Sequence, residues 1–453
     1  MLKFLKILLP VLLVCFFCKV NAQQKTPHKS NLSENKINFT EYDLPNGLHV
    51  ILHQDNSTPV VAVTISYHVG SKNEKPDRTG FAHFFEHLMF EGSPNIKRGE
   101  FYKIVQNAGG NNNANTTQDR TFYYEMLPSN QLELGLWLES ERLFHLRIDS
   151  TGVETQRNVI KEERKQRFDN TPYGTILEQT FSHAYKVHPY RWTPIGSVQY
   201  IDMAKVEEFK EFHDTYYVPQ NATISIAGDI DINKTKEMVK NYFGNIPKGV
   251  KKIERPKEIE PPQAKEVRDT IYDNIQIPAI IMAYHIPAQG TKDYYALSML
   301  TTLISDGESS RLYKSIVDKQ QKAIQVAAFP FALEDPGLFL VFGLPNMGVA
   351  LEELEKSIEA EISKVKTETL NENEYQKLKN KVENDFINKN STMIGIAENL
   401  SDYHVYFGDA GLINTEINKF MNVTKDDISR VANQYLTKEN RVVLYYLPQS
   451  SKK

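Results

Sequence analysis

The chain of 453 residues has very little cysteine, no long apolar run and no excess of basic charge. Its only two cysteines are Cys15 and Cys18. Lysine and arginine total 53 against 57 acidic residues, a net charge of −4 that argues against a general nucleic-acid binder. A hydrophobic fraction of 40% and a charged fraction of 24% exclude collagen-like, low-complexity and wholly disordered classes.

The first 22 residues are predicted to be a signal peptide. Lys3 and Lys6 precede an apolar run, Ile7–Cys18, whose 12 residues are fewer than the roughly 20 that a membrane helix needs. Small or apolar residues at 20–22 predict cleavage before Gln23, with an uncleaved anchor as the alternative. We therefore expect an exported protein without a membrane span, and favour the periplasm over secretion to the medium.

Cleavage at this position would remove both cysteines from the mature chain. A chain without thiols has no disulfide, no cysteine-ligated zinc and no cysteine nucleophile. Any transition-metal site would then need histidine, aspartate or glutamate ligands.

The remaining sequence is predicted to contain two copies of one domain. Residues 65–69 resemble residues 281–286, with Tyr67 and His68 matching Tyr284 and His285 at an offset of 217, and residues 122–128 resemble residues 339–345 at the same offset. A Tyr…Asn pair recurs at an offset of 219. A common order and a nearly constant offset indicate duplication.

The duplication predicts an N-terminal domain at 38–247 and a C-terminal domain at 269–450. The linker between them, residues 248–268, contains three prolines and many charges. Pattern and propensity predict the order β-β-α-β-α-α-α-β for the first domain, over residues 48–53, 60–69, 80–90, 121–126, 132–143, 153–168, 206–216 and 223–227. This order fits neither alternating βαβ units nor an all-β sandwich, so the predicted fold class is α+β.

The most informative motif is an H-x-x-E-H pentapeptide at residues 83–87. On a helix, His83 and His87 project from one face a turn apart, where two neutral imidazoles can bind one zinc ion. Glu86 lies beside that face and can reach a metal-bound water, as in the inverted form of the H-E-x-x-H zinc helix. The alternative is a helix with two incidental histidines.

A catalytic zinc ion needs a third protein ligand and one open position for water. The helix predicted over 153–168 contains Glu162 and Glu163 in a run of charged residues. Spacing alone does not choose between these two carboxylates, and the run otherwise resembles an ordinary solvated face.

With both segments in view, the sequence resembles the insulinase/pitrilysin (inverzincin) family of zinc metallopeptidases. That family has a glutamate ligand in a V-x-x-x-E helix well downstream of the second histidine. Val159 and Glu163 match this pattern, and the offset of 76 between His87 and Glu163 agrees with the family spacing. The resemblance implies one Zn²⁺ per chain, held by His83, His87 and Glu163, with Glu86 as general base toward a metal-bound water.

The resemblance covers the chain from about residue 39 and is to half-length members, similar to the mitochondrial processing peptidase β subunit and to bacterial periplasmic relatives. It implies two homologous domains, each a mixed, mostly antiparallel sheet packed with helices. In the second copy, Ser298, Thr301 and Thr302 stand where the first has its zinc-helix residues, which predicts a domain without a zinc site.

The polar segment 109–116 resembles the family's segment that leads into the edge strand beside the metal. There an extended substrate adds to the sheet through backbone hydrogen bonds. Asn113 and Ala114 match the family's Asn-Ala pair, which contacts the peptide next to the scissile bond. Composition alone favours a surface loop tip.

Two departures from the family pattern stand out. Gln156, seven residues before Glu163, replaces a glutamate that many members have. The C-terminal Arg and Tyr that bind the substrate carbonyl in relatives are missing, since Val317 and Ile324 lie near their expected places. Because the family builds a closed chamber from four domains, we expect a dimer. A partner chain that has the pair and lacks H-x-x-E-H is favoured over a second identical chain.

The sequence therefore predicts a zinc-dependent endopeptidase that acts on peptides or unfolded polypeptide segments. One alternative is a catalytically silent assembly or binding subunit. Such subunits usually lose a ligand or the base, whereas this chain has all four residues. A second alternative, a zinc hydrolase of non-peptide substrates, would not need the strand-binding edge. The physiological substrate does not follow from the sequence.

Overall fold

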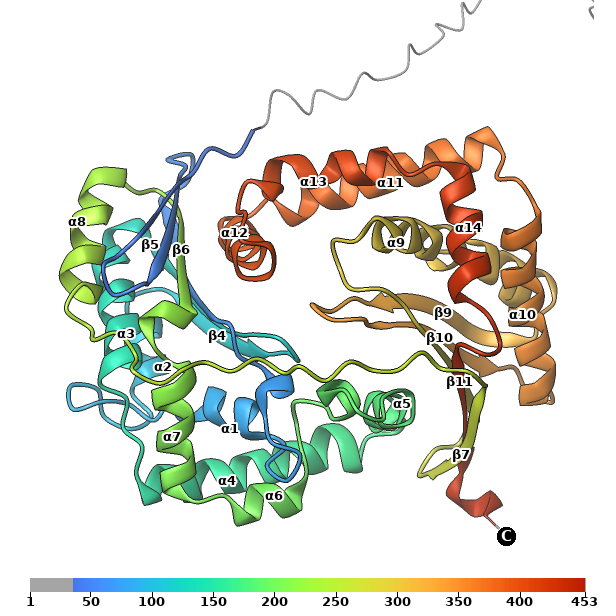
Figure 1. Ribbon diagram of the computed structural model, residues 1–453, viewed down its shortest axis with the longest axis horizontal. Helices are drawn as coiled ribbons and strands as arrows, with labels where there is room; N and C mark the ends of the chain where they lie inside the picture. Colours follow the sequence, from blue (N-terminus) through green and yellow to red (C-terminus); the bar gives the residue numbers. More distant parts are fainter. Residues whose placement is uncertain (1–35, 453) are drawn as a thin grey trace, which may run out of the picture. The chain divides into compact units, whose positions relative to one another are not determined.

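The computed structural model describes residues 36–452, which form two mixed β-sheets with helices packed on them (Figure 1). The predicted α+β class is confirmed by these elements. The predicted signal peptide, residues 1–22, lies outside the described residues. Within residues 36–452, every helix is too short or too polar to cross a membrane.

The first sheet has six strands in the order β1-β2-β6-β3-β5-β4. Strands β2 and β6 are parallel, and every other neighbouring pair is antiparallel. The central strand β6 is buried along its whole length. Its sequence, isoleucine with small residues, suits a strand that is covered on both faces. The strands span Thr40–Asp43 (β1), His49–Gln54 (β2), Val60–Tyr67 (β3), Asn111–Thr116 (β4), Thr121–Pro128 (β5) and Ala222–Gly228 (β6).

The second sheet repeats this topology without a counterpart of β1. Its order is β7-β11-β8-β10-β9, and its β7–β11 pair is parallel like the β2–β6 pair. Strands β5 and β10 begin at equivalent positions of the sequence repeat, and so do β6 and β11. The strands span Val267–Asp273 (β7), Ala279–His285 (β8), Ala323–Phe331 (β9), Leu338–Pro345 (β10) and Arg441–Pro448 (β11). The two halves are therefore homologous in fold.

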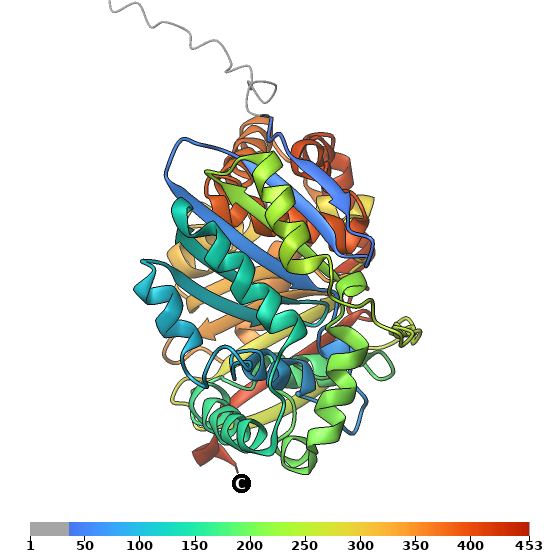
Figure 2. The ribbon, with the colours of Figure 1, turned by 90° about the vertical axis from the view of Figure 1, so that its left-hand side faces the viewer.

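The helices of the first half include the four predicted from the sequence. These are α1 (Phe81–Leu88), α3 (Leu132–Phe144), α4 (Ser150–Arg164, continued by a π-turn, Lys165–Asp169) and α7 (Val206–Tyr216). The prediction missed α2 (Phe101–Asn107), α5 (Ile176–Ala184), α6 (Val198–Met203) and α8 (Ile232–Phe243), together with strands β1 and β4. Helices α3 and α8 lie across the outer face of the first sheet (Figure 2) and bury it in one apolar core.

The second half contributes six helices among the described residues. They are α9 (Lys292–Ser305), α10 (Leu351–Thr367), α11 (Glu372–Lys389), α12 (Met393–Phe407), α13 (Leu412–Met421) and α14 (Lys425–Tyr435). Most have polar outer faces and apolar inner faces, and α12 and α14 begin at a threonine whose hydroxyl accepts a hydrogen bond from the first turn.

The two halves exchange one helix each. Leu400 and Ala397 of α12, in the second half, pack against Ala62 and Ala227 on the inner face of the first sheet. In return, α5 of the first half packs on the inner face of the second sheet. Figure 1 shows α12 beside the first sheet and α5 beside the second. Helices α5 and α12 begin at equivalent positions of the sequence repeat, so the exchanged helices are corresponding parts of the two copies.

This exchange predicts that α12 contributes strongly to stability. Leu400 is fully buried between the halves, so Leu400→Ala should lower the free energy of unfolding by about 2–5 kcal/mol, measured by urea denaturation. Ile387→Ala on α11, where the side chain is 48% exposed, is the control and should change it by less than about 0.5 kcal/mol. Equal effects of the two substitutions would contradict the role given to α12.

Candidate metal centre

Helix α1 places the histidines of the H-x-x-E-H motif toward the space between α1 and α4. The helix begins after Gly80, whose φ of 96° is readily adopted only by glycine. The carboxylate of Glu74 accepts hydrogen bonds from the backbone N–H groups of Gly80 and Ala82, at 3.0 and 2.7 Å, and so satisfies the first turn. Phe84 and Phe85 are fully buried, which fixes the rotation of the helix.

The structure brings His83, His87 and Glu163 together. The Nε2 atoms of His83 and His87 lie 3.6 and 3.3 Å from Oε2 of Glu163. One ligand atom from each residue lies within 4.8 Å of the others. Glu162, the other candidate, is exposed and pairs with Lys165 at 2.6 Å, so only Glu163 faces the histidines.

The residues fit a zinc ion by three observations. Two imidazoles and one carboxylate are a donor set typical of catalytic zinc. The Nε2 atoms of both histidines converge on the same carboxylate oxygen, Oε2 of Glu163. Burial, helped by the neighbouring His87, lowers the pKa of His83 to about 4, so its ring is neutral and can donate a lone pair.

The electrostatics of the site favour a bound cation. Burial alone would lower the pKa of His87, but the carboxylates of Glu163 and Glu86 outweigh it and raise this pKa. The hydrogen bond from His87 lowers the pKa of Glu163 despite partial burial. The pocket thus stabilises positive charge between the histidines and the carboxylate.

Gln156 lies behind His87 and orients its ring. Its Oε1 lies 3.2 Å from Nδ1 of His87, and its Nε2 donates to Oε1 of Glu91 at 2.5 Å. Protonated His87 donates from Nε2 to Glu163, whereas the neutral ring with its hydrogen on Nδ1 presents the lone pair of Nε2 there. Outer hydrogen bonds of this kind fix the tautomer and direction of metal-binding histidines. The glutamine at this departure from the family pattern therefore keeps a contact with the site.

Glu86 lies beside the three convergent residues. Its Oε2 accepts a hydrogen bond of 2.5 Å from Oγ1 of Thr116 on strand β4. Burial raises the pKa of Glu86, although Thr116 and His87 act in the opposite direction. A carboxylate with a raised pKa binds and releases a proton nearer to neutral pH than an exposed one.

Strand β4 runs beside α1 at the edge of the first sheet. It pairs with β5 on one side only, with Asn113 opposite Tyr124 and Ala114 opposite Tyr123. The segment predicted to lead into the edge strand is thus the edge strand itself, rather than a loop tip. Its outer backbone groups have no strand partner among the described elements and can pair with an extended peptide.

Hydrogen bonds and ion pairs connect the turn between β4 and β5 to the second half. Asp119 accepts hydrogen bonds from the hydroxyl of Tyr190, at 2.6 Å, and from the backbone N–H of Glu334, at 3.0 Å. Lys72, only 4% exposed, lies 2.9 Å from Asp119 and 2.6 Å from Glu334. The pairing of Lys72 with Glu334 does not follow from the sequence, because the two residues are far apart along the chain.

The neighbouring Arg120 makes a second attachment, to helix α12. Its guanidinium lies 2.5 Å from Glu398 and 2.6 Å from Asp402. Two adjacent residues of the turn are therefore held by residues of the second half, which limits the movement of the edge strand relative to that half.

Helix α9, the equivalent of α1 in the second half, has a serine and two threonines in place of the zinc-helix residues. On α9, the hydroxyls of Thr301 and Thr302 donate to backbone carbonyls of their own helix, at 2.9 and 3.3 Å. No metal-binding group of residues occurs there in the described part of the chain. The predicted positions of the missing Arg and Tyr fall on a π-turn, Tyr313–Lys319, and on strand β9.

Comparisons with known proteins match the two halves of the chain to two different family models. Residues 49–193 match the family model described as insulinase, peptidase family M16. Residues 204–382 match the model described as peptidase M16 inactive domain. The first match covers all four residues of the candidate centre, and the second lies beyond them.

The chain is similar to the zinc protease PqqE of Helicobacter pylori, with 33% identity over 441 residues and 97% of each chain covered. A crystal structure of a protease from Helicobacter pylori superposes with a TM-score of 0.87 at 32% identity, over 91% of this chain and 100% of that one. The periplasmic protease PqqL of Escherichia coli shares the fold, with a TM-score of 0.75 at 18% identity, over 90% of this chain and 47% of that one.

The similarity to a zinc protease extends over nearly the whole chain, and the family model covers the helix that brings the two histidines together. The chain therefore belongs to the insulinase family of peptidases, family M16.

Proposed function

We propose that the protein is a zinc-dependent endopeptidase that hydrolyses peptides or unfolded polypeptide segments. The observation that carries the proposal is the convergence of His83, His87 and Glu163 within 4.8 Å, with Glu86 beside them. The unpaired edge of β4 next to this group supports an extended substrate. The names of the relatives, zinc proteases, support the same activity.

His83, His87 and Glu163 would hold the zinc ion. When bound, zinc supplies a Lewis acid that acidifies a water molecule and polarises the scissile carbonyl. Glu86 would take the proton of the attacking water and return it to the leaving nitrogen. The hydrogen bond from Thr116 holds Oε2 of Glu86 and leaves its other oxygen for this transfer.

Strand β4 would bind the substrate as an added strand of the first sheet. Backbone hydrogen bonds then hold peptides of many sequences extended across the site, and neighbouring side chains choose among them. We place Asn113 and Ala114 next to the scissile bond. The fastening of the β4–β5 turn through Asp119 and Arg120 would keep this edge in a fixed position relative to the zinc residues.

The silent-subunit alternative receives less support. The match to the inactive-domain model lies on residues 204–382 and leaves residues 83–163 outside it. The four residues of the centre are all present and lie together. A bound subunit without activity would not require a buried Glu86 held beside the ligands.

We also propose that the protein is exported and acts as a dimer. The chain supplies two homologous halves, and it matches 47% of the Escherichia coli periplasmic protease PqqL, a protein about twice as long. That relation supports a working unit of four such halves, here built from two chains. It also supports a periplasmic location.

Glu86→Gln tests the proposed base. The amide keeps the size of the side chain but cannot accept a proton, so turnover should fall at least about 100-fold while one zinc per chain remains bound. Hydrolysis of a quenched peptide library and zinc analysis of the purified protein measure both quantities. Glu162→Gln, an exposed neighbour of Glu163, makes the same charge change and should leave both unaltered. Wild-type turnover by Glu86→Gln would exclude the role.

Gln156→Ala tests the orientation of His87. Without the acceptor on Nδ1, His87 loses its fixed direction, and zinc affinity should fall about 10–100-fold. Competition with a chelator measures the change. Asn158→Ala lies on the exposed side of the same helix and serves as the control. An unchanged affinity in Gln156→Ala would show that packing alone orients the ring.

Sedimentation of the mature chain tests the assembly. We expect a dimer, and we expect addition of a homologous chain that has the missing Arg and Tyr to raise peptidase activity. Full activity of a pure homodimer would remove the need for such a chain, and full activity of a monomer would exclude the four-domain arrangement.

A further inference from the structure

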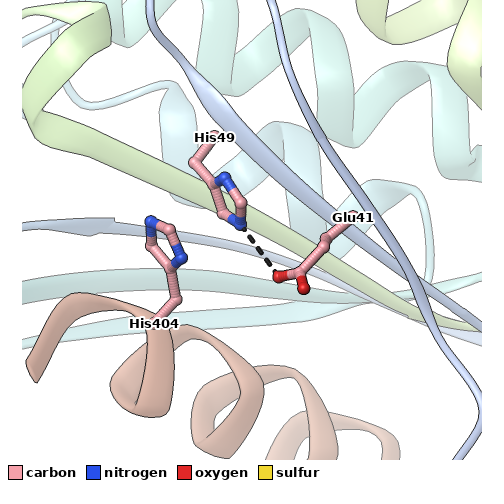
Figure 3. A group of neighbouring side chains, drawn as sticks. All are labelled: Glu41, His49 and His404. Atoms are coloured by element: carbon pink, nitrogen blue, oxygen red, sulfur yellow. Dashed lines mark hydrogen bonds and ion pairs between the residues drawn. The ribbon is translucent and has the colours of Figure 1, made fainter. Parts of the chain in front are cut away.

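A second group of histidines and carboxylates lies where helix α12 crosses strands β1 and β2 (Figure 3). It consists of Glu41 and Asp43 on β1, His49 on β2 and His404 on α12, and we refer to it as the α12 crossing cluster. Glu41, His49 and His404 each offer a ligand atom within 4.8 Å of the others. None of these residues belongs to the candidate metal centre.

Both ring nitrogens of His49 face carboxylates. Nδ1 lies 2.8 Å from Oδ1 of Asp43, and Nε2 lies 3.3 Å from Oε2 of Glu41. A neutral imidazole donates from only one nitrogen. When the shorter contact takes the hydrogen, the lone pair of Nε2 points at the carboxylate of Glu41. The lone pairs of His49 Nε2 and Glu41 Oε2 then repel each other. A cation between these two atoms would remove the repulsion, because each atom could bind it as a ligand.

The contact between His49 and Asp43 resembles the outer contact of a metal-binding histidine. Such ligands usually donate their second N–H to a carboxylate, which fixes the tautomer and makes the other nitrogen a stronger donor. Asp43 therefore fixes the tautomer of His49 so that its Nε2 can bind a metal ion, as Gln156 does for His87.

His404 supplies a second imidazole from the other half of the chain. Its ring is parallel to that of His49, with a centroid distance of 3.4 Å and an angle of 5°. Neither of its ring nitrogens has a hydrogen-bond partner within residues 36–452. Imidazole lone pairs lie in the plane of the ring, so the two parallel rings bind one ion only when His404 turns about its Cβ–Cγ bond and leaves the stack.

The charge and the donor types select the kind of ion. The two carboxylates balance the charge of a divalent cation, and the two imidazoles offer it nitrogen ligands. Nitrogen donors from two histidines with one carboxylate oxygen suit zinc, nickel or copper, whereas calcium and magnesium prefer all-oxygen sites.

We propose that Glu41, His49 and His404 form a second site for a divalent transition-metal ion, which joins helix α12 of the second half to strands β1 and β2 of the first. Strands β1 and β2 are neighbours in the sheet that α12 covers. The ion adds a bond between the halves close to the apolar contact of Leu400. It takes no part in the chemistry proposed at His83 and His87, so the site stands or falls independently of the peptidase activity.

The test counts ions in chains whose first site has been removed. Metal-free mature protein without an affinity tag is dialysed against buffered Zn²⁺, and bound zinc is measured by mass spectrometry. We expect two ions per wild-type chain and one in the double variant His83→Ala/His87→Ala. Adding His404→Gln to the double variant should remove the remaining ion. Adding His183→Gln instead should not, because the pair formed by His183 and Asp269 has no second histidine.

Thermal unfolding provides a second measurement. Zinc should raise the melting temperature of the double variant but not that of the triple variant with His404→Gln, because the ion holds the two halves together. A double variant that unfolds cooperatively and binds no zinc would overturn the proposal, as would an ion that persists after His404→Gln. If the double variant fails to fold, His404→Gln in the wild-type background decides: a fall from two ions to one supports the site, and two ions exclude it.

Discussion

Each sheet of this protein has an inner face on which a helix of the other half packs. Ala62 and Ala227 on the first sheet are fully buried because α12 lies on them, and Ile281 and Leu340 on the second are buried by α5. Burial of apolar surface is the main stabilising contribution to folding. The arrangement of the two halves, and with it the position of the edge strand, depends on this exchange.

The exchange of α5 and α12 affects the two parts of the candidate site differently. His83, His87 and Glu163 all come from the first half, and α1 and α4 alone bring them together. The edge strand, however, ends in a turn whose charged residues are paired with the second half. The candidate metal ligands and the proposed peptide-binding edge therefore have separate supports. Duplication makes the separation understandable, since one copy kept its histidines while the equivalent helix α9 has threonines at those positions.

Much of the fold could be predicted from the sequence, because its signals are local. Strands β3 and β5 are rich in β-branched and aromatic residues, and the buried residues of α1 and α4 recur at helical spacing. Strand β4 could not be predicted from propensity, since asparagine is unfavourable in strands and its exposure alternates only because β5 pairs with it. Of the site, the two histidines and Glu86 follow from the motif, whereas the choice of Glu163 over Glu162 required the family resemblance.

Other contacts leave no trace in a single sequence. The exchange of α5 and α12 arises from tertiary packing, and the pairing of Lys72 with Glu334 joins residues that are 262 positions apart. The stack of His49 on His404 is of the same kind. Residues of this type have ordinary neighbours in the chain, and only the folded arrangement gives them a partner.

The exchanged helices also determine how the molecule responds to a break in the chain. The segment between α8 and β7, residues 244–266, contains no helix or strand, so cutting it removes no element of either sheet. Each fragment would then carry one sheet with an uncovered apolar face and one helix whose apolar side fits the other fragment. The apolar surfaces of the two fragments are therefore complementary. They should associate spontaneously when produced together, and each should aggregate when produced alone.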